Sequence, residues 1–539
     1  MIACCWTAFL AGPISIAWLI ARYGVNVAVQ DEIRIGAFLV RNHGRLFPLA
    51  ADLFAQHNES RKVFPRLIFF YLAGLTGWNV KYEMAVSLVL ACGIAVVIGI
   101  LARRTLPDRD AALVATALAV LLIFSPVQWW NWLFGIQIVV FIPLLMLVVA
   151  LLVATSQLSL TWRMVIAAAC CLIATYSYAN GMLLWVLAGI ALFARAEDRR
   201  PMFVAVWLAL FGAAIGSYFF GYQRPPMSPA MVSPLARPVE LAEFVLAFIG
   251  HPLSWADSLT PSVLMGAAAA TIFVTLAIRA GRSSLPWTLL GCYTIVSAGV
   301  TAVGRLGNGI QTAVEPRYAT FAIVIWIAVV MLAAAAMPRG RAIGAILLLA
   351  LHTMAVHAAW PAIRESYRDH LVARAATQFS SVLPDRSLLQ RLVETNADLA
   401  ATTVAALSRI GYVNPPIVES DLVQSLRAAG DSKAQGVFEG VLRLSPRETV
   451  LYGWARLPDG RPADAVLIAR VAADGDHVVA LSERTIQRPD RPGMGWDLPL
   501  TRRLAVPGSE YHAYAYDTAT RRVYPLAGSL RVARRESPH

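Results

Sequence analysis

The segment DEIRIGAFLVRNHGRLFPLAADLFAQHNESRKVFPR, from Asp31 to Arg66, is a polar stretch that follows the first apolar run of the chain. It carries two adjacent carboxylates, Asp31 and Glu32, and a run of polar side chains from His57 to Arg61. Placing charged side chains against a membrane costs free energy unless they have a function or are well solvated. The segment therefore predicts a polar loop after a membrane-spanning helix.

The composition predicts a membrane protein. Hydrophobic residues make up 58% of the 539 residues and charged residues 15%, and the mean hydropathy is +0.59. Soluble domains are far less apolar. All six cysteines lie in apolar runs, so a disulfide framework is not expected. The net charge of +13 lies mostly in short loops beside apolar runs and in the C-terminal half. We attribute it to membrane topology and predict no nucleic-acid partner.

About eleven apolar runs are long enough to be predicted as spans, so the fold class is a polytopic α-helical membrane protein. The runs cover residues 2–20, 83–102, 110–125, 135–154, 164–178, 181–194, 202–220, 262–278, 286–304, 318–337 and 342–360. The run 63–77 is too short to span comfortably, and we predict an interfacial or re-entrant helix there.

The distribution of arginine predicts the orientation of these spans. If every run crosses, alternate loops contain most of the basic residues, and such loops are cytoplasmic. The arginines in this set are Arg103, Arg104, Arg109, Arg163, Arg195, Arg199, Arg200, Arg279, Arg282, Arg339 and Arg341. The N-terminus is then cytoplasmic, and loops 21–82 and 221–261 and everything after Trp360 are extracytoplasmic. We predict the bacterial cytoplasmic membrane as the location.

The outer loops hold the candidate functional groups, each with a simpler alternative. Arg305 and Arg317 flank a glycine-containing loop suited to a phosphate, or they reach ordinary lipid headgroups. Asp31 and Glu32 are candidate catalytic groups, or they begin a solvated helix.

The histidine and tryptophan residues of these loops are candidate metal and sugar contacts. His57 and Glu59 lack metal-ligand spacing, so no metal is predicted from them. Trp129, Trp130 and Trp132 are typical of the membrane interface, or they stack on a sugar ring.

Four outer segments carry a resemblance to a known superfamily. They are HNESRKVFPRL at 57–67, FSPVQWWNWLFGIQ at 124–137, YSYANG at 176–181 and GRLGNGIQTAVEPRYAT at 304–320. With the acidic first loop, residues 1–360 resemble the integral-membrane C-type glycosyltransferases (the GT-C superfamily). More narrowly, they resemble a bacterial group that uses polyprenyl-phosphate-linked sugars.

The resemblance implies an inverting transfer of sugar from a polyprenyl-phosphate donor to an envelope glycan, lipid or protein acceptor. Asp31 or Glu32 would be the general base, and Arg305, Arg317 and Tyr318 would bind the donor phosphate. The other expected substrate-binding residues are His57, Glu59, Arg61, Arg66, Gln128, Asn131, Trp132, Gln137, Asn180 and Arg224. No cofactor is required, and a divalent cation held jointly with the phosphate remains open.

The C-terminal part is predicted to be extracytoplasmic, with a helical connector over 361–432 and a β-sandwich over 433–535. The sandwich rests on short alternating segments: VLRL, TVLYGWARL, DAVLIARV, HVVALSERT, YHAYAYD and RVYPL. It resembles modules appended to bacterial surface-glycan enzymes, which implies carbohydrate contact. The alternative is that Trp454 and Tyr514 only pack in its core.

Two other functions fit the span count. A lipid-linked sugar flippase or transporter would carry polar groups near the bilayer midplane and repeated halves, and neither is evident. A non-catalytic glycan-binding membrane protein leaves the outer-face acidic and arginine groups unexplained. No glycine-rich phosphate loop marks a nucleotide-sugar fold, so a lipid-linked donor is favoured.

Overall fold

The computed structural model describes residues 2–225, 236–255, 258–337, 340–383, 385–426, 435–445, 448–482, 490 and 493–533, with side chains omitted at 2–6 and 196. Arg339 and the outer ends of the predicted sandwich lie outside these residues. The chain forms two compact units. The helical unit comprises Met1–Gly24, Pro48–Tyr71 and Lys81–Ile363, and the mixed unit comprises Val25–Phe47, Leu72–Val80 and Arg364–His539.

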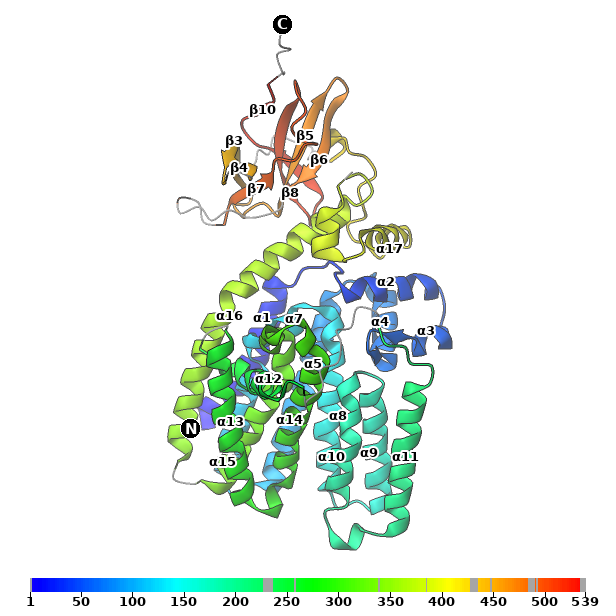
Figure 1. Ribbon diagram of the computed structural model, residues 1–539, viewed down its shortest axis with the longest axis vertical. Coiled ribbons are helices and arrows are strands. Elements are labelled where there is room, and N and C mark those ends of the chain that lie inside the picture. The colour runs from blue at the N-terminus through cyan, green and yellow to red at the C-terminus, as the bar shows by residue number, and fades with distance from the viewer. Residues whose placement is uncertain are drawn as a thin grey trace. The chain divides into compact units, whose positions relative to one another are not determined.

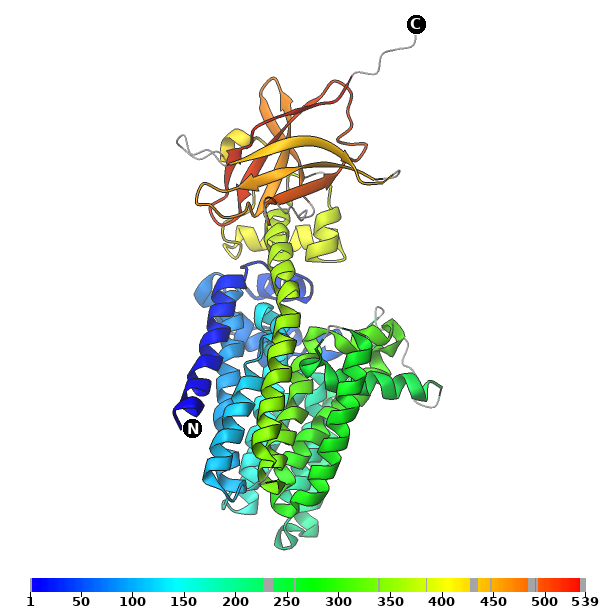
Figure 2. The ribbon, with the colours of Figure 1, turned by 90° about the vertical axis from the view of Figure 1, so that its left-hand side faces the viewer.

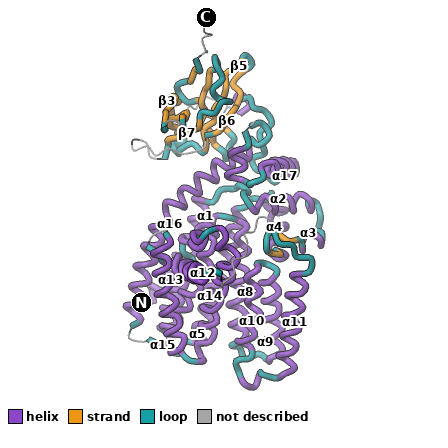
Figure 3. The backbone as a smooth tube through the Cα atoms, viewed as in Figure 1, coloured by secondary structure: helices purple, strands orange, loops and turns teal. Residues whose placement is uncertain are grey.

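The helical unit is a bundle of apolar helices with one small hairpin (Figures 1 and 3). Its longer helices are α1 (Ile2–Tyr23), α4 (Val63–Thr76, shared with the mixed unit), α5 (Lys81–Thr105), α6 (Arg109–Ile123), α8 (Ile138–Ala154), α9 (Leu160–Thr175), α10 (Leu183–Leu192), α11 (Pro201–Phe219), α12 (Pro238–Gly250), α13 (Leu259–Ala280), α14 (Leu285–Arg305) and α15 (Ala319–Ala336). Short elements are α3 (Ala50–Phe54), α7 (Trp129–Leu133), β1 (Gln56–His57) and β2 (Ser60–Arg61).

Eight helices in the described ranges are long and apolar enough to cross a membrane, which indicates a membrane-spanning protein. They are Lys81–Thr105, Arg109–Leu133, Gly135–Ala154, Pro201–Phe219, Leu259–Ala280, Arg282–Asn308, Pro316–Ala336 and Arg341–Gln378. The predicted spans 2–20, 164–178 and 181–194 coincide with shorter apolar helices, Thr7–Tyr23, Leu160–Thr175 and Ala179–Leu192. The segment predicted as a short interfacial helix is α4, which is also below spanning length.

The predicted arginine-rich loops are joined to one another by polar contacts. Arg341 pairs with Asp108 at 2.7 Å between Nη1 and Oδ2, and the indole of Trp287 donates to Thr105 Oγ1 at 2.9 Å. Arg163, on α9, donates from Nη2 to both carboxylate oxygens of Asp198 at 2.8 Å. These contacts join the loops after α5, α13 and α15 to one another, and the loop after α8 to the loop after α10. Figure 1 shows these loops at the same end of the helical unit.

A close helix crossing shapes the predicted outer loop 221–261, which contains α12. Gly250 of α12 faces Gly266 of α13, and a Cβ atom added at Gly250 would lie 1.9 Å from the Ser262 carbonyl oxygen. Only glycine leaves room for two helix backbones to approach so closely. Phe244 and Phe248 on the same helix are fully buried, so α12 packs into the bundle.

The mixed unit contains α2 (Asp31–Asn42) and the last part of the long helix α16 (Arg341–Gln378), whose residues up to Ile363 belong to the helical unit. Figure 2 shows α16 as one uninterrupted helix. The expected boundary at 360 lies inside this helix, near the division of the two units between Ile363 and Arg364. A π-helical turn (Leu389–Val393) and α17 (Ala397–Arg409) follow. Part of the predicted outer loop 21–82 belongs to this unit, because 25–47 and 72–80 pack with the C-terminal residues.

Two antiparallel sheets end the described chain. One has the strand order β3 (Gln435–Arg443), β4 (Thr449–Arg456), β7 (Gly495–Pro499). The other contains β5 (Ala465–Ala472), β6 (Gly475–Leu481), β8 (Glu510–Asp517), β9 (Arg522–Pro525) and β10 (Leu530–Arg531), with β8 pairing β5, β9 and β10. Each of the six predicted segments overlaps a strand. The short strands β7 and β10 are additional.

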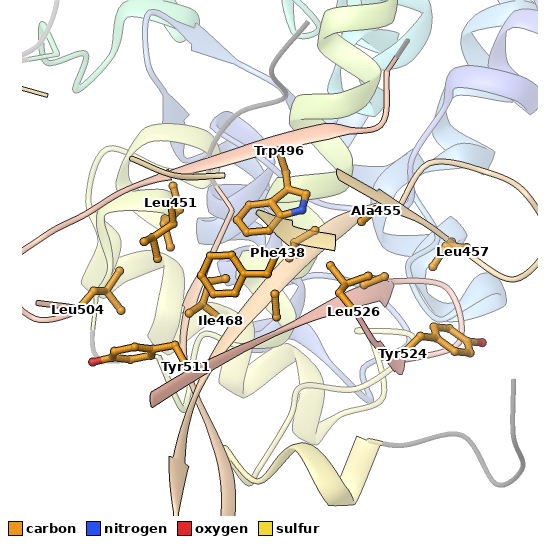
Figure 4. Close-up of a cluster of buried hydrophobic side chains, with 14 residues drawn as sticks. Phe438, Leu451, Ala455, Leu457, Ile468, Trp496, Leu504, Tyr511, Tyr524 and Leu526 are labelled. Carbon is orange, nitrogen blue, oxygen red and sulfur yellow. The ribbon is translucent and has the colours of Figure 1, made fainter. Parts of the chain in front are cut away.

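Both sheets contribute to one apolar core, as a β-sandwich requires (Figure 4). Phe438 and Trp496 pack at 5.5 Å between ring centroids, opposite Ile468 and Tyr511 from the second sheet. Trp454 is only half buried and lies outside this core. Its neighbours Gly453 and Ala455 on β4 are buried, because successive residues of a strand face opposite sides.

Arg163→Ala should destabilise the helical unit strongly. The Arg163 and Asp198 side chains are only 4% and 8% exposed, and removing one partner of a buried ion pair costs about 3–5 kcal/mol. We expect a clear fall in the thermal unfolding midpoint of the purified protein.

The matched control is Arg199→Ala. Arg199 is exposed and donates to the carbonyl oxygens of Phe193 and Ala194; exposed substitutions usually change stability by less than about 0.5 kcal/mol. Replacing both partners, as Arg163→Met with Asp198→Leu, should recover most of the loss. Equal shifts for Arg163→Ala and Arg199→Ala would contradict the assignment.

Candidate functional site

The polar residues 56–61 form a tight hairpin at the end of the helical unit away from the arginine-rich loops. Gln56 pairs with Arg61 and His57 with Ser60, leaving the two-residue loop Asn58-Glu59. Asn58 has φ 51°, a left-handed conformation that asparagine tolerates better than most residues and that two-residue hairpin loops require.

Arg61 holds this hairpin to the end of α11. Its Nε donates to the Tyr218 carbonyl oxygen at 2.7 Å and its Nη1 to that of Phe54 at 2.6 Å, and Nη2 reaches the Phe220 carbonyl oxygen. The Tyr218 hydroxyl in turn donates to the carbonyl oxygen of Glu59 at 3.1 Å. Arg61 thus binds orphan carbonyl groups at a helix C-terminus, which is a positioning role for the hairpin.

Arg66 is 5% exposed and plays a comparable part. Its Nη1 donates to the carbonyl oxygens of Asp52 and Leu53, at 2.8 and 3.0 Å. These carbonyl groups end the short helix α3, so the side chain fixes the entry to the hairpin.

Glu59, at the hairpin tip, is joined to the loop between α14 and α15. Its Oε1 lies 2.9 Å from Nη2 of Arg305, and the two side chains are 34% and 29% exposed. A second pair, Arg317 with Glu315, lies in the same loop, with 2.5 Å between Nη2 and Oε2. We call these four residues, with Tyr178 and Tyr318, the arginine cluster.

Two tyrosines complete the arginine cluster. The Arg317 guanidinium lies over the Tyr318 ring, 5.1 Å from its centroid, a cation–π contact. The Tyr178 ring, from the turn between α9 and α10, stacks on Phe321 at 5.6 Å. Tyr178 interacts electrostatically with both arginines and with Glu59, so the cluster joins three segments distant in sequence.

The remaining quoted segment, 124–137, is hydrogen-bonded to the residues around Arg317. Asn131 Nδ2 donates to the Arg317 carbonyl oxygen at 3.0 Å and to Thr320 Oγ1 at 2.6 Å, and Thr320 donates to the side-chain oxygen of Gln128. Trp132 is fully buried and its indole donates to the Ser125 carbonyl oxygen. Asn131 therefore holds the backbone of the loop between α14 and α15, and Gln128 contacts the end of that segment through Thr320. Trp132 bonds within its own segment and offers no exposed face to a sugar.

The remaining predicted substrate-binding residues differ in exposure. His57, Gln137 and Asn180 are buried, and Arg224 is exposed. Burial and the Glu59 carboxylate raise the pKa of Tyr222, while Arg224 lowers it, so the loop after α11 lies in the electrostatic field of the hairpin tip.

Asp31 and Glu32 belong to the mixed unit, where they open α2. Glu32 is 1% exposed, and its Oε2 accepts a hydrogen bond from the Val29 backbone N–H at 3.1 Å. It therefore stabilises the helix start as a buried group, whereas the simpler alternative expected a solvated carboxylate there. Asp31 is half buried, and of the two it is the carboxylate with more access to solvent.

The charges of the arginine cluster balance, with Arg305 and Arg317 opposed by Glu59 and Glu315. Two partly exposed guanidinium groups can bind a phosphate or another oxyanion bidentately, and the anion would compete with the glutamates. Arg317 Nε and Asn131 Oδ1 are buried without a hydrogen-bond partner among the described residues. No group of three His, Cys, Asp or Glu side chains suited to a metal is found in the described ranges.

Sequence reasoning did not select Tyr218 or Thr320, which position the hairpin and the loop. Both lie in apolar helices, and their partners are 159 and 189 residues away along the chain. Tyr178 and Glu315 stand beside predicted residues in the quoted segments, and that adjacency was the available signal. The chain matches no protein-family model and no curated protein.

Glu59→Gln should strengthen oxyanion binding, and Arg305→Gln should weaken it. A partly exposed ion pair contributes about 0.2–1 kcal/mol, so releasing Arg305 from Glu59 should raise affinity by up to about fivefold. Titration of inorganic pyrophosphate into the purified protein by calorimetry measures both effects.

Arg199→Gln, at the opposite end of the bundle, serves as the charge-matched control and should leave the affinity unchanged. Tighter binding in Arg305→Gln, or equal losses in Arg305→Gln and Arg199→Gln, would show that pyrophosphate binds elsewhere.

Proposed function

We propose that the chain is an inverting membrane glycosyltransferase. In this proposal it takes a sugar from a polyprenyl-phosphate donor and transfers it to an envelope glycan, lipid or protein acceptor at the outer face of the bacterial cytoplasmic membrane. The observation that carries the proposal is the convergence of four polar segments, distant in sequence, at the end of the bundle away from the arginine-rich loops. There they present Arg305 and Arg317.

The proposed donor site is the arginine cluster. A polyprenyl phosphate has its charge at headgroup level and its chain in the bilayer, so a receptor needs cationic groups at the end of an apolar bundle. Arg305 and Arg317 meet this need, and Tyr318 supports Arg317 through its ring. Phosphate oxygens would displace the glutamates, whose pairing holds the guanidinium groups in place in the free protein.

The proposed reaction is a displacement at the anomeric carbon. An acceptor hydroxyl gives its proton to a carboxylate and forms the new glycosidic bond, while the bond between the anomeric carbon and the phosphate oxygen breaks. The polyprenyl phosphate leaves with the electron pair, and the arginines stabilise its growing charge. Attack opposite the leaving group inverts the configuration.

The base is assigned by the resemblance, which offers Asp31 and Glu32. We propose Asp31, because the Glu32 carboxylate is buried and bonded to the Val29 N–H. Glu32 then has a structural role in α2.

Asp31→Asn and Arg317→Gln should each reduce transfer at least about a hundredfold, the usual loss when a group that stabilises the transition state is removed. Glu32→Gln should instead lower the unfolding midpoint. Mass spectrometry of envelope glycans and polyprenyl-phosphate sugars in cells carrying each variant measures transfer.

Accumulation of the lipid-linked donor together with loss of one sugar from the glycan is the expected result for Asp31→Asn and Arg317→Gln. The Arg199→Gln protein should retain full transfer. If Asp31→Asn is fully active and the null strain instead changes the distribution of lipid-linked sugar across the membrane, the transporter alternative replaces this proposal.

A further inference from the structure

A small pocket in the mixed unit carries an inference that is independent of the proposed transferase. Its walls come from the last turns of α16, the end of α17 with the loop to Pro415, and the N-terminal segments around Asn26 and Trp78. All of these residues belong to the mixed unit.

The polar side of the pocket is one face of α16. Arg374, Thr377 and Gln378 are three and four residues apart, a spacing that places side chains together on a helix. Gln378 is already satisfied, since its Nε2 donates to the Thr518 carbonyl oxygen and its Oε1 accepts from the Tyr516 hydroxyl, both at 2.9 Å. Arg374 and Thr377 supply the remaining polar groups of this face.

Two polar atoms at this face lack partners. Thr377 is 7% exposed, and its Oγ1 has no hydrogen-bond partner among the described residues. The same holds for Arg374 Nε, although Nη2 of that side chain donates to the Asn414 carbonyl oxygen at 3.2 Å. Burying a hydroxyl without a hydrogen-bond partner is unfavourable, and a bound acceptor would remove that cost.

Arg374 is a cation without an ion pair within the described part of the chain. Asp464 and Asp517 act on it electrostatically, but both carboxylates lie within 4 Å of Arg461, at 3.8 and 3.9 Å. Asp464 also accepts two hydrogen bonds from Thr518. The charge of Arg374 is therefore available to an anion.

The size of the pocket limits that anion. Its volume is about 40 Å³, and one water-sized atom needs roughly 10–15 Å³. About three such atoms fit, which is the size of a carboxylate group. The Trp78 ring and the Tyr412 side chain line the pocket, and Trp78 is held at φ 54°, a conformation costly for a bulky residue and common at ligand sites.

We propose that this pocket binds the carboxylate group of a small acidic ligand, with an acidic sugar as the ligand class. Arg374 holds the carboxylate through its guanidinium, the Thr377 hydroxyl donates to one carboxylate oxygen, and the aromatic side chains border the rest of the molecule. A neutral sugar lacks the group that pairs with Arg374.

The test is calorimetric titration of the full chain in phosphatidylcholine nanodiscs at low ionic strength. The probes are sodium glucuronate, glucose, sodium acetate and inorganic phosphate. We expect glucuronate to bind at one site and glucose not to bind. Tighter binding of glucuronate than of acetate supports an acidic sugar as the ligand, and equal affinities for the two would overturn that ligand class.

Two variants locate the binding. Arg374→Gln should weaken glucuronate at least about tenfold, the loss expected for a charge-assisted pair. Thr377→Val should weaken it about fivefold, the value of one hydrogen bond. Without ligand, Thr377→Val should not lower the thermal unfolding midpoint, because the hydroxyl it removes has no partner.

Arg409→Gln, an exposed arginine on α17 that donates to the Ala405 carbonyl oxygen, is the charge-matched control and should bind as the wild type does. The proposal is overturned by no binding of any carboxylate, by phosphate binding more tightly than glucuronate, or by unchanged affinity in both pocket variants. A lower unfolding midpoint in Thr377→Val without ligand would also contradict the proposal, because it would show that the Thr377 hydroxyl already has a hydrogen-bond partner.

Discussion

The cost of placing charge among apolar helices governs the helical unit. In a bilayer every charged side chain must be paired, bonded to backbone carbonyl groups or carried to a helix end, and the described residues use all three solutions. Arg163 and Asp198 form a buried pair, Arg61 and Arg66 bind carbonyl oxygens, and Arg305 pairs with Glu59 at the bundle end. The arginine cluster follows from this constraint, since groups excluded from the spans collect where loops meet.

The same constraint explains why the fold could largely be predicted from sequence. Long apolar runs have few alternatives to helices, and the predicted spans coincide with helices even where Leu160–Thr175 and Ala179–Leu192 are short. The alternation of apolar and polar residues also predicted the strands, except the short strands β7 and β10. The division of loop 21–82 between the two units was not predictable, because packing of 25–47 against residues beyond 364 depends on contacts that no local pattern records.

The sequence predicted which segments form the candidate site more accurately than it predicted what each side chain does there. All four quoted segments meet, but the residues predicted to bind substrate contact the protein itself. Asn131, Trp132, Arg61 and Arg66 donate to backbone carbonyl groups, and Gln128 accepts from the Thr320 hydroxyl. The sequence alone does not distinguish a loop residue that binds a substrate from one that binds a carbonyl group 157 residues away, as Arg61 does. Glu32 shows the same ambiguity, since a carboxylate at a helix start suits either catalysis or capping.

Charge balance in the arginine cluster bears on how a donor site at this position would work. Unpaired arginines at a bundle end would attract any anionic lipid headgroup. Arginines paired with Glu59 and Glu315 bind an anion only if it displaces these carboxylates. A weak partner such as Glu59, about one third exposed, is displaced at small cost by a ligand with more acceptor oxygens. A single headgroup phosphate would gain little binding free energy by displacing a glutamate. A ligand that also contacts the hairpin and the 176–181 turn would gain more. Selectivity would then arise from the glutamates as much as from the arginines, because they set the free energy that a ligand must exceed.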